Sequence, residues 1–236
     1  MEAIQAWAQS VWEQIDFNLI QGDRYLMMLD GLKVTLQISV AAAVIGVLLG
    51  SIIALMRLSN AHIGRWYFLR TIATWYVDII RGTPVVVQLL IMYFIIMVNV
   101  SNPLPIGIAT FGLNSAAYVS EMVRGGILAV DKGQTEAGRS LGLSSASTML
   151  LIVLPQALKV ALPSLLNEFI ALLKETAIVG YVGMMDLTKA GDFIRSRTFS
   201  AFFPLIAVAL VYLLMVTALS KLFALIERRI RLSDQR

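Results

Sequence analysis

Long apolar runs that contain no charged residue are the main feature of this chain. Four of them extend over 19 to 39 residues each, at 34–56, 82–120, 140–158 and 198–220. A helix that crosses the hydrocarbon core of a bilayer needs about 20 mostly apolar residues. The pattern therefore predicts an all-α polytopic membrane protein.

Prolines, glycines and polar stretches divide these runs into five expected transmembrane helices. The expected spans are approximately 32–56, 84–98, 106–130, 148–184 and 202–226. The fourth of these is too long for one straight crossing. We therefore expect Pro155 and Pro163 to break or kink it, because proline removes a helical hydrogen bond and crowds the preceding turn.

The start of the second span has the local chemistry of a turn that leads into a helix. In Arg81-Gly82-Thr83-Pro84, glycine can end the preceding segment, threonine can cap, and proline suits the first helical position. Backbone geometry explains these residues without a functional role. The preceding stretch, 66–80, alternates apolar and polar residues and is expected to lie along the membrane interface.

Two segments outside the spans are also distinctive. Residues 1–31 are acidic and amphipathic with interleaved aromatic residues, and are expected to form an extracytoplasmic surface helix or helix pair. They are followed by a single transmembrane domain, 32–236. Within it, 186–200 is polar and is expected to be a loop.

The distribution of basic residues predicts the orientation, because cytoplasmic loops of membrane proteins carry an excess of Lys and Arg. The segment 57–83 has four arginines against one acid, the loop 131–148 has two bases, and the C-terminal stretch 221–236 has five. Residues 1–33 have five acids and only two bases. This pattern places the N-terminus outside and the C-terminus in the cytoplasm.

Composition removes several function classes. Apolar residues make up 58% of the 236 positions and charged residues 14%, against about 25% charged in a soluble domain. The chain has no cysteine and one histidine, His62, so thiolate metal sites, disulfides and histidine metal clusters are excluded. No His-Glu-x-x-His motif or catalytic residue is recognised. The net charge of +4 orients loops, so no nucleic-acid partner is expected.

The loop 131–148 is longer than a simple connection between spans requires. It contains small residues at helical spacing, namely Ala137, Gly138, Ser140 and Gly142. Gly142 can end a short helix, and Ser144 or Ser145 can cap the next one. We expect a short cytoplasmic helix that lies across its neighbours and docks into a groove on a partner.

The residues of this loop resemble the EAA loop of ABC importer permeases. Glu136-Ala137 is followed by Gly142 and then by Ile152-x-Leu154-Pro155. Segments elsewhere narrow the resemblance to the polar amino-acid permease family: 35–39, 81–84, 88–89, 114–121, 124–127, 133–137, 154–158 and 172–176. Gly138 departs from the family pattern, which usually has alanine there.

The resemblance implies the ABC importer type I permease fold and a set of partners. These are a second permease copy or a homologue, two cytoplasmic ATPase subunits and an extracytoplasmic solute-binding protein, all acting on a polar amino acid. No P-loop sequence occurs in the chain, so ATP and Mg²⁺ are expected on the ATPase and no cofactor on this chain, which is then not an enzyme. The implied location is the bacterial cytoplasmic (inner) membrane. The residues implied to insert into the ATPase are Glu136, Ala137, Gly138, Leu141 and Gly142.

Ionisable residues within spans are costly and are functional candidates. Counted from Lys159 near the cytoplasmic interface, Glu168 lies about 13 Å deeper, close to the membrane midplane. Glu168 and Glu175 are nearly two turns apart and share one helical stripe, with Asn167 and Lys174 on the adjacent stripe. A zwitterionic amino acid needs partners of both signs, and this face supplies both.

Asn114, Tyr118 and Glu121 form a similar stripe on the third span. The predicted substrate-binding residues are Asn167, Glu168, Asn114, Glu121, Lys174 and Glu175. Glu168 further suggests a substrate with a cationic side chain. The alternative interpretation is an internal ion pair, Lys174 with Glu175 or Glu121, that only holds helices together.

A second function class stays open. A stand-alone ion-coupled amino-acid carrier or channel could use Glu168 or Glu121 as a proton site. Such a carrier would not need an ATPase-docking helix, and five spans without an internal repeat are unusual for one.

Overall fold

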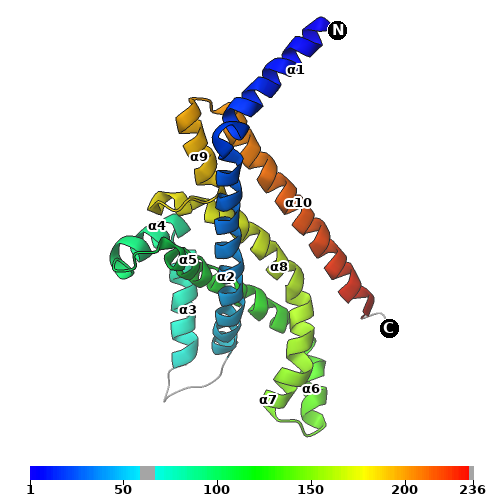
Figure 1. The fold of residues 1–236 in the computed structure, drawn as a ribbon. Coiled ribbons are helices and arrows are strands. Elements are labelled where there is room, and N and C mark those ends of the chain that lie inside the picture. Colours follow the sequence, from blue (N-terminus) through cyan, green and yellow to red (C-terminus); the bar gives the residue numbers. More distant parts are fainter. Residues whose placement is uncertain (59–66, 234–236) are drawn as a thin grey trace.

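The computed structural model describes residues 1–58 and 67–233, and the side chains up to residue 230. Every regular element in these ranges is a helix (Figure 1). The only histidine, His62, and the basic residue Arg65 lie outside the described residues.

The chain begins with two helices joined by irregular turns. Helix α1 (Glu2–Ile15) is followed by a π-helical turn (Asp16–Ile20), a 3₁₀ turn (Gln21–Asp23) and α2 (Arg24–Leu58). The remaining elements are α3 (Phe68–Arg81), α4 (Val85–Ile91) with a π-helical turn (Met92–Ile96), α5 (Pro103–Ala129), α6 (Lys132–Ser140), α7 (Ser145–Thr148), a π-helical turn (Met149–Val153), α8 (Leu154–Glu175), a 3₁₀ segment (Thr176–Val182), α9 (Leu187–Thr198) and α10 (Phe202–Ser233).

Three continuous helical stretches in the described residues are long and apolar enough to cross a membrane. They are Glu2–Leu58, Ser145–Val182 and Phe202–Ile230. The pair Phe68–Arg81 and Val85–Ile96, bent by 104°, is a fourth if it is one broken span. Helix α5 does not pass the same test because its many small and polar residues lower its hydropathy. The five-span count and the orientation of the termini stay predictions.

Helix α3 belongs to the bundle, although its sequence suggests an interfacial helix. It buries Ala73 and Val77 against neighbouring helices and runs alongside α2 (Figure 1). The turn after it also differs from the prediction. Pro84, rather than Thr83, is the N-cap of α4, and the Thr83 hydroxyl donates to the Ile79 carbonyl, 2.9 Å away.

The segment expected as a polar loop after the fourth span contains helix α9. The Asp186 carboxylate caps it by accepting hydrogen bonds from the backbone N–H groups of Thr188 and Lys189, both at 3.0 Å. Leu187, Ala190 and Ile194 are fully buried. The high density of charged residues concealed this sparse apolar stripe.

Pro155 and Pro163 behave differently from one another. A π-helical turn ends just before α8, and Pro155 occupies the first turn of α8, where the missing N–H is not needed. The α-helix continues through Pro163. The stretch Ser145–Val182 is continuously helical, so the expected break occurs at neither proline, and a kink stays a prediction.

Helices α2 and α5 make the most extensive contact in the fold. A Cβ atom on Gly46 would lie 2.6 Å from the Ser115 hydroxyl, and one on Gly50 would lie 2.8 Å from the Ala116 carbonyl oxygen. No larger residue fits at either position without a shift. This Gly-x-x-x-Gly pattern lets the two backbones approach as closely as helices do in membranes.

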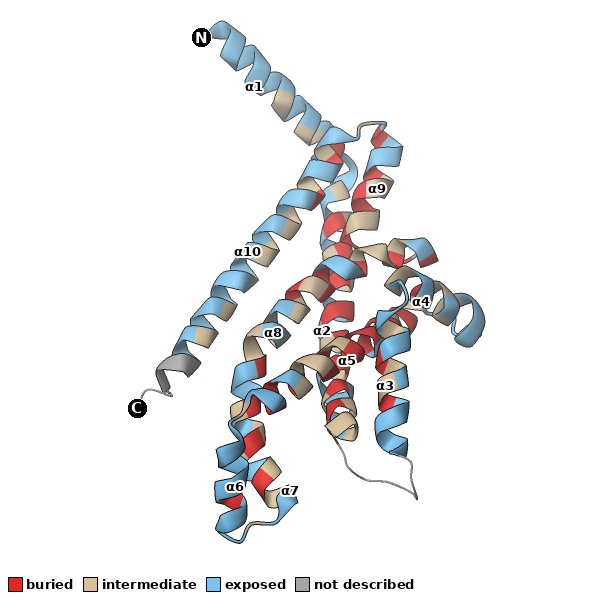
Figure 2. Cartoon of the chain, turned by 180° about the vertical axis from the view of Figure 1, so that it is seen from behind, coloured by how far each residue is buried: buried red, intermediate tan, exposed pale blue. Residues whose placement is uncertain are grey.

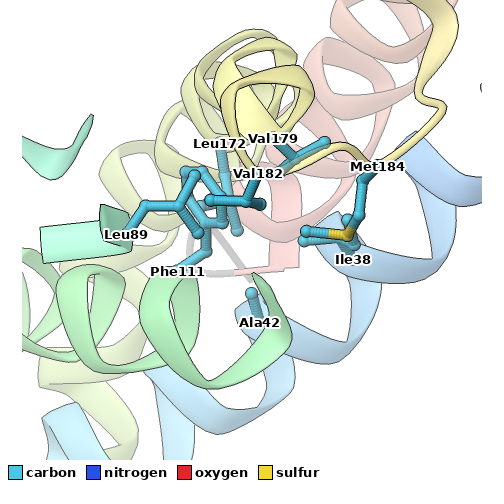
Figure 3. Close-up of a cluster of buried hydrophobic side chains, with 8 residues drawn as sticks. All are labelled: Ile38, Ala42, Leu89, Phe111, Leu172, Val179, Val182 and Met184. Carbon is cyan, nitrogen blue, oxygen red and sulfur yellow. The ribbon is translucent and has the colours of Figure 1, made fainter. Parts of the chain in front are cut away.

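A cluster of buried side chains joins α2, α4, α5, α8 and the segment that follows α8. Figure 3 shows Ile38 and Ala42 from α2, Leu89 from α4, Phe111 from α5, Leu172 from α8 and three residues beyond it, Val179, Val182 and Met184. Buried residues concentrate on α2 and α5, whereas α1 and α10 are mostly exposed (Figure 2). The buried interior thus contains apolar side chains together with small and polar ones, while many other large apolar side chains are exposed.

We expect Gly50→Ala to destabilise the protein, because the added methyl group meets the Val119 side chain at 2.7 Å and the Ala116 carbonyl. Overpacking of this kind costs about 1–3 kcal/mol. The matched control is Gly125→Ala on α5, where nothing lies within 4 Å of the added carbon. That change should be neutral or stabilising by up to about 1 kcal/mol. The thermal midpoints of the purified variants in detergent measure both effects, and equal midpoints would contradict the packing account.

Candidate functional site

A polar cavity of about 370 Å³ lies where the α3–α4 bend meets α5 and the end of α8. Its lining residues are Arg81, Gly82, Thr83, Pro84, Val85, Asn114, Tyr118 and Glu175. The bend exists because Gly82 and Pro84 separate two helices at a steep angle. The cavity therefore combines the bent backbone of one hairpin with side chains from two long helices.

Charges of opposite sign face this cavity. Arg81 projects from the last turn of α3, and Glu175 is the last residue of α8. The Arg81 guanidinium lies 5.3 Å from the centre of the Tyr118 ring, within cation–π range. Its Nη1 atom is 3.6 Å from Glu121 Oε1. Arg81 is thus held in place while its side chain stays 45% exposed.

Hydrogen bonds fix the bend against α5. Asn114, which is buried, donates from Nδ2 to Gln88 Oε1 at 3.0 Å. Gln88 Nε2 in turn donates to the Ile80 carbonyl and to the Thr83 hydroxyl, both at 2.8 Å. The two amides therefore link α5, α4 and the end of α3 in one network at the cavity wall.

Glu121 is surrounded by arginines. Its carboxylate accepts from Arg57 Nη1 at 2.6 Å and from Arg124 at 2.7 Å, with Arg81 at 3.6 Å. The alternative ion pair of Glu121 with Lys174 is therefore wrong, because these arginines are the partners of Glu121. The network connects α2, α3 and α5.

The six residues predicted to bind substrate separate into three groups. Asn114 and Glu175 line the cavity. Glu121 does not line it, but its Oε1 atom lies 3.6 Å from the lining residue Arg81. Glu168 is half-buried and accepts a hydrogen bond from the Ser115 hydroxyl at 3.2 Å, outside the lining. Asn167 and Lys174 are exposed and do not line this cavity. A substrate role for each of them stays a prediction.

Sequence reasoning missed Arg81 as a candidate. Its neighbours Gly82 and Pro84 explained the motif by backbone geometry, and this concealed the side chain. A signal was nevertheless present, because Arg81 is the charged residue directly before the longest charge-free run. A cation at such a boundary can extend towards a cavity within the bundle.

The expected short helix of the 131–148 loop is α6. The Asp131 carboxylate caps it by accepting from the Gly133 N–H at 2.8 Å. Gly142 follows it with φ at +83°, the left-handed conformation that glycine adopts most readily. The Ser144 hydroxyl then accepts from the Ser147 N–H at 3.1 Å and begins α7. These local predictions are confirmed.

Helix α6 presents one face outwards and one inwards. Glu136, Ala137 and Leu141 are exposed, with Leu141 at 81% of its surface. Gly138 is buried, and a Cβ atom there would lie 2.8 Å from both the Ile152 and the Thr148 side chains. The absence of a side chain at Gly138 therefore lets α6 pack closely against the segment that follows it. This explains why the position holds glycine, where the resemblance suggests alanine.

Comparisons with known proteins agree on one family. Residues 46–232 match the family model described as the binding-protein-dependent transport system inner membrane component. The arginine transport system permease protein ArtQ of Bacillus subtilis is 37% identical over 210 residues, covering 88% of this chain and 94% of its own. The glutamine transport system permease protein GlnP of Escherichia coli is 34% identical, covering 87% and 94%.

Solved structures show the same relationship. A chain from an amino acid ABC transporter with histidines is 42% identical, with a TM-score of 0.80, and the match covers 89% of this chain and 97% of that one. The methionine ABC transporter MetNI, in inward-facing conformations, matches with a TM-score of 0.76 at 20% identity, covering 87% and 96%. This second similarity supports the fold alone.

Replacing Glu121 by Gln should destabilise the protein, because Arg57 and Arg124 would then lack their shared carboxylate inside the bundle. We expect a loss of about 1–3 kcal/mol, below the full cost of breaking a buried pair because the Glu121 side chain is 23% exposed. Asp192→Asn is the matched control, since Asp192 pairs with Lys189 and Arg195 on the surface. It should lose less than about 1 kcal/mol. Thermal unfolding that affects both variants equally would contradict a structural role for the Glu121 network.

Proposed function

Because this chain belongs to the family of binding-protein-dependent transport system inner membrane components, we propose how its polar cavity and helix α6 serve import. The chain is a permease component of an amino-acid ABC importer. In our proposal two copies, or this chain and a homologue, form the path through the bacterial inner membrane. Each has five spans, an outer N-terminus and a cytoplasmic C-terminus. Two ATPase subunits bind ATP and Mg²⁺, and an extracytoplasmic protein delivers the solute.

The observation that carries the proposed substrate site is that Arg81 and Glu175, which have opposite charges, both line one cavity. An L-amino acid has a carboxylate and an ammonium group on one carbon. In the proposal the Arg81 guanidinium binds the carboxylate and Glu175 binds the ammonium, each by charge-assisted hydrogen bonds. Asn114 and Gln88 hold the cavity wall in position through their amide contact.

In the proposal the side chain of the substrate extends beyond the cavity lining towards a second carboxylate, that of Glu168, which lies outside the lining. Glu168 and Glu175 are seven residues apart on α8, about 10 Å along the helix axis, and both precede the 3₁₀ segment. Two carboxylates on one helix favour a substrate that carries an additional positive charge. We therefore propose a polar L-amino acid with a cationic side chain, such as arginine, lysine or histidine. One of the relatives named above is described as an arginine permease.

Helix α6 is proposed to dock into a cleft of the ATPase through Glu136, Ala137 and Leu141. These three residues are exposed, and α6 and α7 protrude from one end of the bundle (Figure 1). Helix α5 leads into α6, and α7 leads through a π-helical turn into α8. These are the helices that supply Tyr118 and Glu175 to the cavity. Motion of the ATPase would therefore reach the cavity through covalently continuous helices.

The first test measures uptake into vesicles that contain the complete importer. Arg81→Gln and Glu175→Gln should each lower the apparent affinity for amino acids about tenfold or more, since each removes one charge-assisted contact of about 1.4 kcal/mol or more. The control is Lys221→Gln, which removes an exposed charge from α10 outside the cavity. If Arg81→Gln and the control behaved alike, the assignment of the cavity would be wrong.

The same assay tests the preference for a cationic substrate independently of the Arg81 and Glu175 assignment. Glu168→Gln should weaken uptake of arginine or lysine much more than uptake of glutamine, because only a cationic side chain loses an ionic partner. Equal loss for all substrates would refute the cationic preference while leaving the Arg81 and Glu175 assignment intact.

The second test concerns coupling. Glu136→Lys reverses a charge on the exposed face of α6, and we expect it to abolish ATP-driven uptake while the ATPase retains activity of its own. Lys132→Glu is the matched charge reversal at the first residue of the same helix, one turn before Glu136, and it should have a smaller effect because Lys132 lies outside the proposed contact. Uptake by Glu136→Lys at the unaltered rate, or uptake by the chain without ATP, would favour a stand-alone carrier.

A further inference from the structure

A second cavity, distinct from the candidate substrate site, lies at the end of the bundle where α2 ends and α3 begins. It measures about 400 Å³ and is lined by Arg57, Leu58, Arg70, Thr74, Arg124 and Leu128. The three arginines come from three different helices, α2, α3 and α5. Both ends of the connection between α2 and α3 lie at the end of the molecule that carries α6 and α7 (Figure 1).

This cavity has an excess of positive charge. The carboxylate of Glu121 is shared by Arg57, Arg124 and Arg81, so it cannot neutralise all of them. Within the described part of the chain, Arg70 forms no ion pair. The only acidic residue of α3, Asp78, does not line the cavity, and the nine residues between α2 and α3 contain no Asp or Glu. An anion is therefore the ligand that the charges favour.

Donor groups remain available to such an anion. Arg57 uses Nη1 towards Glu121, and Arg124 uses Nε and Nη2. A guanidinium has further N–H groups beyond those. Thr74 lies four residues after Arg70 on α3, so both side chains face the same side of the helix. Several convergent guanidinium forks and a hydroxyl match the geometry of phosphate oxygens.

Apolar surroundings indicate where the phosphate comes from. Leu58 and Leu128 line the same cavity, and Leu128 is largely exposed. On α3, Ile72, Trp75 and Ile79 are exposed at a helical spacing that forms one outward stripe. In a membrane this stripe contacts acyl chains. This α3 stripe lies on the opposite side of the helix from Arg70 and Thr74, so the acyl chains of a lipid whose headgroup enters the cavity would instead meet Leu58 and Leu128 in its lining.

We propose that the Arg57–Arg70–Arg124 cavity is a binding site for a phosphate group, supplied by the headgroup of an anionic phospholipid. The lipid bridges the ends of α2, α3 and α5 by binding guanidinium groups from all three. It is separate from the amino-acid site and does not depend on the proposed transport function.

The test uses the full-length protein in nanodiscs of phosphatidylcholine with increasing phosphatidylglycerol, and follows the thermal midpoint and the bound lipid by native mass spectrometry. Arg70→Gln should weaken retention of phosphatidylglycerol about tenfold, because it removes a charge-assisted contact to phosphate. Arg70 is chosen because it takes no part in the Glu121 network, so its loss should leave folding intact. Arg70→Lys should restore part of the binding, since lysine keeps the charge but not the bidentate fork.

Arg228→Gln is the matched control, because it removes an exposed arginine from α10 without touching the cavity. It should retain phosphatidylglycerol like the unaltered protein. In a parallel arm the protein in detergent receives inorganic phosphate alone. Stabilisation by millimolar phosphate that Arg70→Gln abolishes would support the site with free phosphate as the ligand. If Arg70→Gln and Arg228→Gln behave alike with both probes, the site does not exist.

Discussion

The close approach of α2 and α5 is the constraint on which the rest of the structure depends. Gly46 and Gly50 leave no room for a side chain against Ser115 and Ala116, and this contact sets the relative position of the two longest buried helices. In a bilayer the hydrophobic effect does not favour helix association, so close packing and polar contacts must supply the attraction. The same juxtaposition places Arg57 next to Glu121 and so anchors the charged network.

Helix α5 connects the polar cavity, the arginine network and the second cavity because it is packed against protein over most of its length. It contributes Asn114 and Tyr118 to the polar cavity, Glu121 to the arginine network and Arg124 to the second cavity. Each of these polar groups has a protein partner, as the low dielectric of the surroundings requires. The low hydropathy of α5 therefore results from its interior position. A hydropathy test for membrane spans gives a low value for such a helix.

Local chemistry could be predicted from the sequence, and tertiary arrangement could not. Gly142 and Ser144 define the ends of α6 and α7 because capping depends only on neighbouring residues. Arg81 becomes a candidate site residue only because the fold brings Tyr118 and Glu175 to the same cavity, and these two residues come from distant parts of the chain. Helix α9 was missed for a related reason, because its three buried apolar residues are surrounded by charges and become a recognisable stripe only once α2 and α10 pack against them.

The buried position of Gly138 has a mechanical consequence. Because α6 packs closely against Thr148 and Ile152 at this position, we expect α6 and the segment that leads into α8 to tilt together as one rigid unit. The 22 residues of α8 span about 33 Å. A tilt of about 5° at the α6 end would thus move the far end, where Glu175 is located, by about 3 Å, which is the length of one hydrogen bond. A small rotation is therefore enough to make or break a single polar contact at the far end of α8.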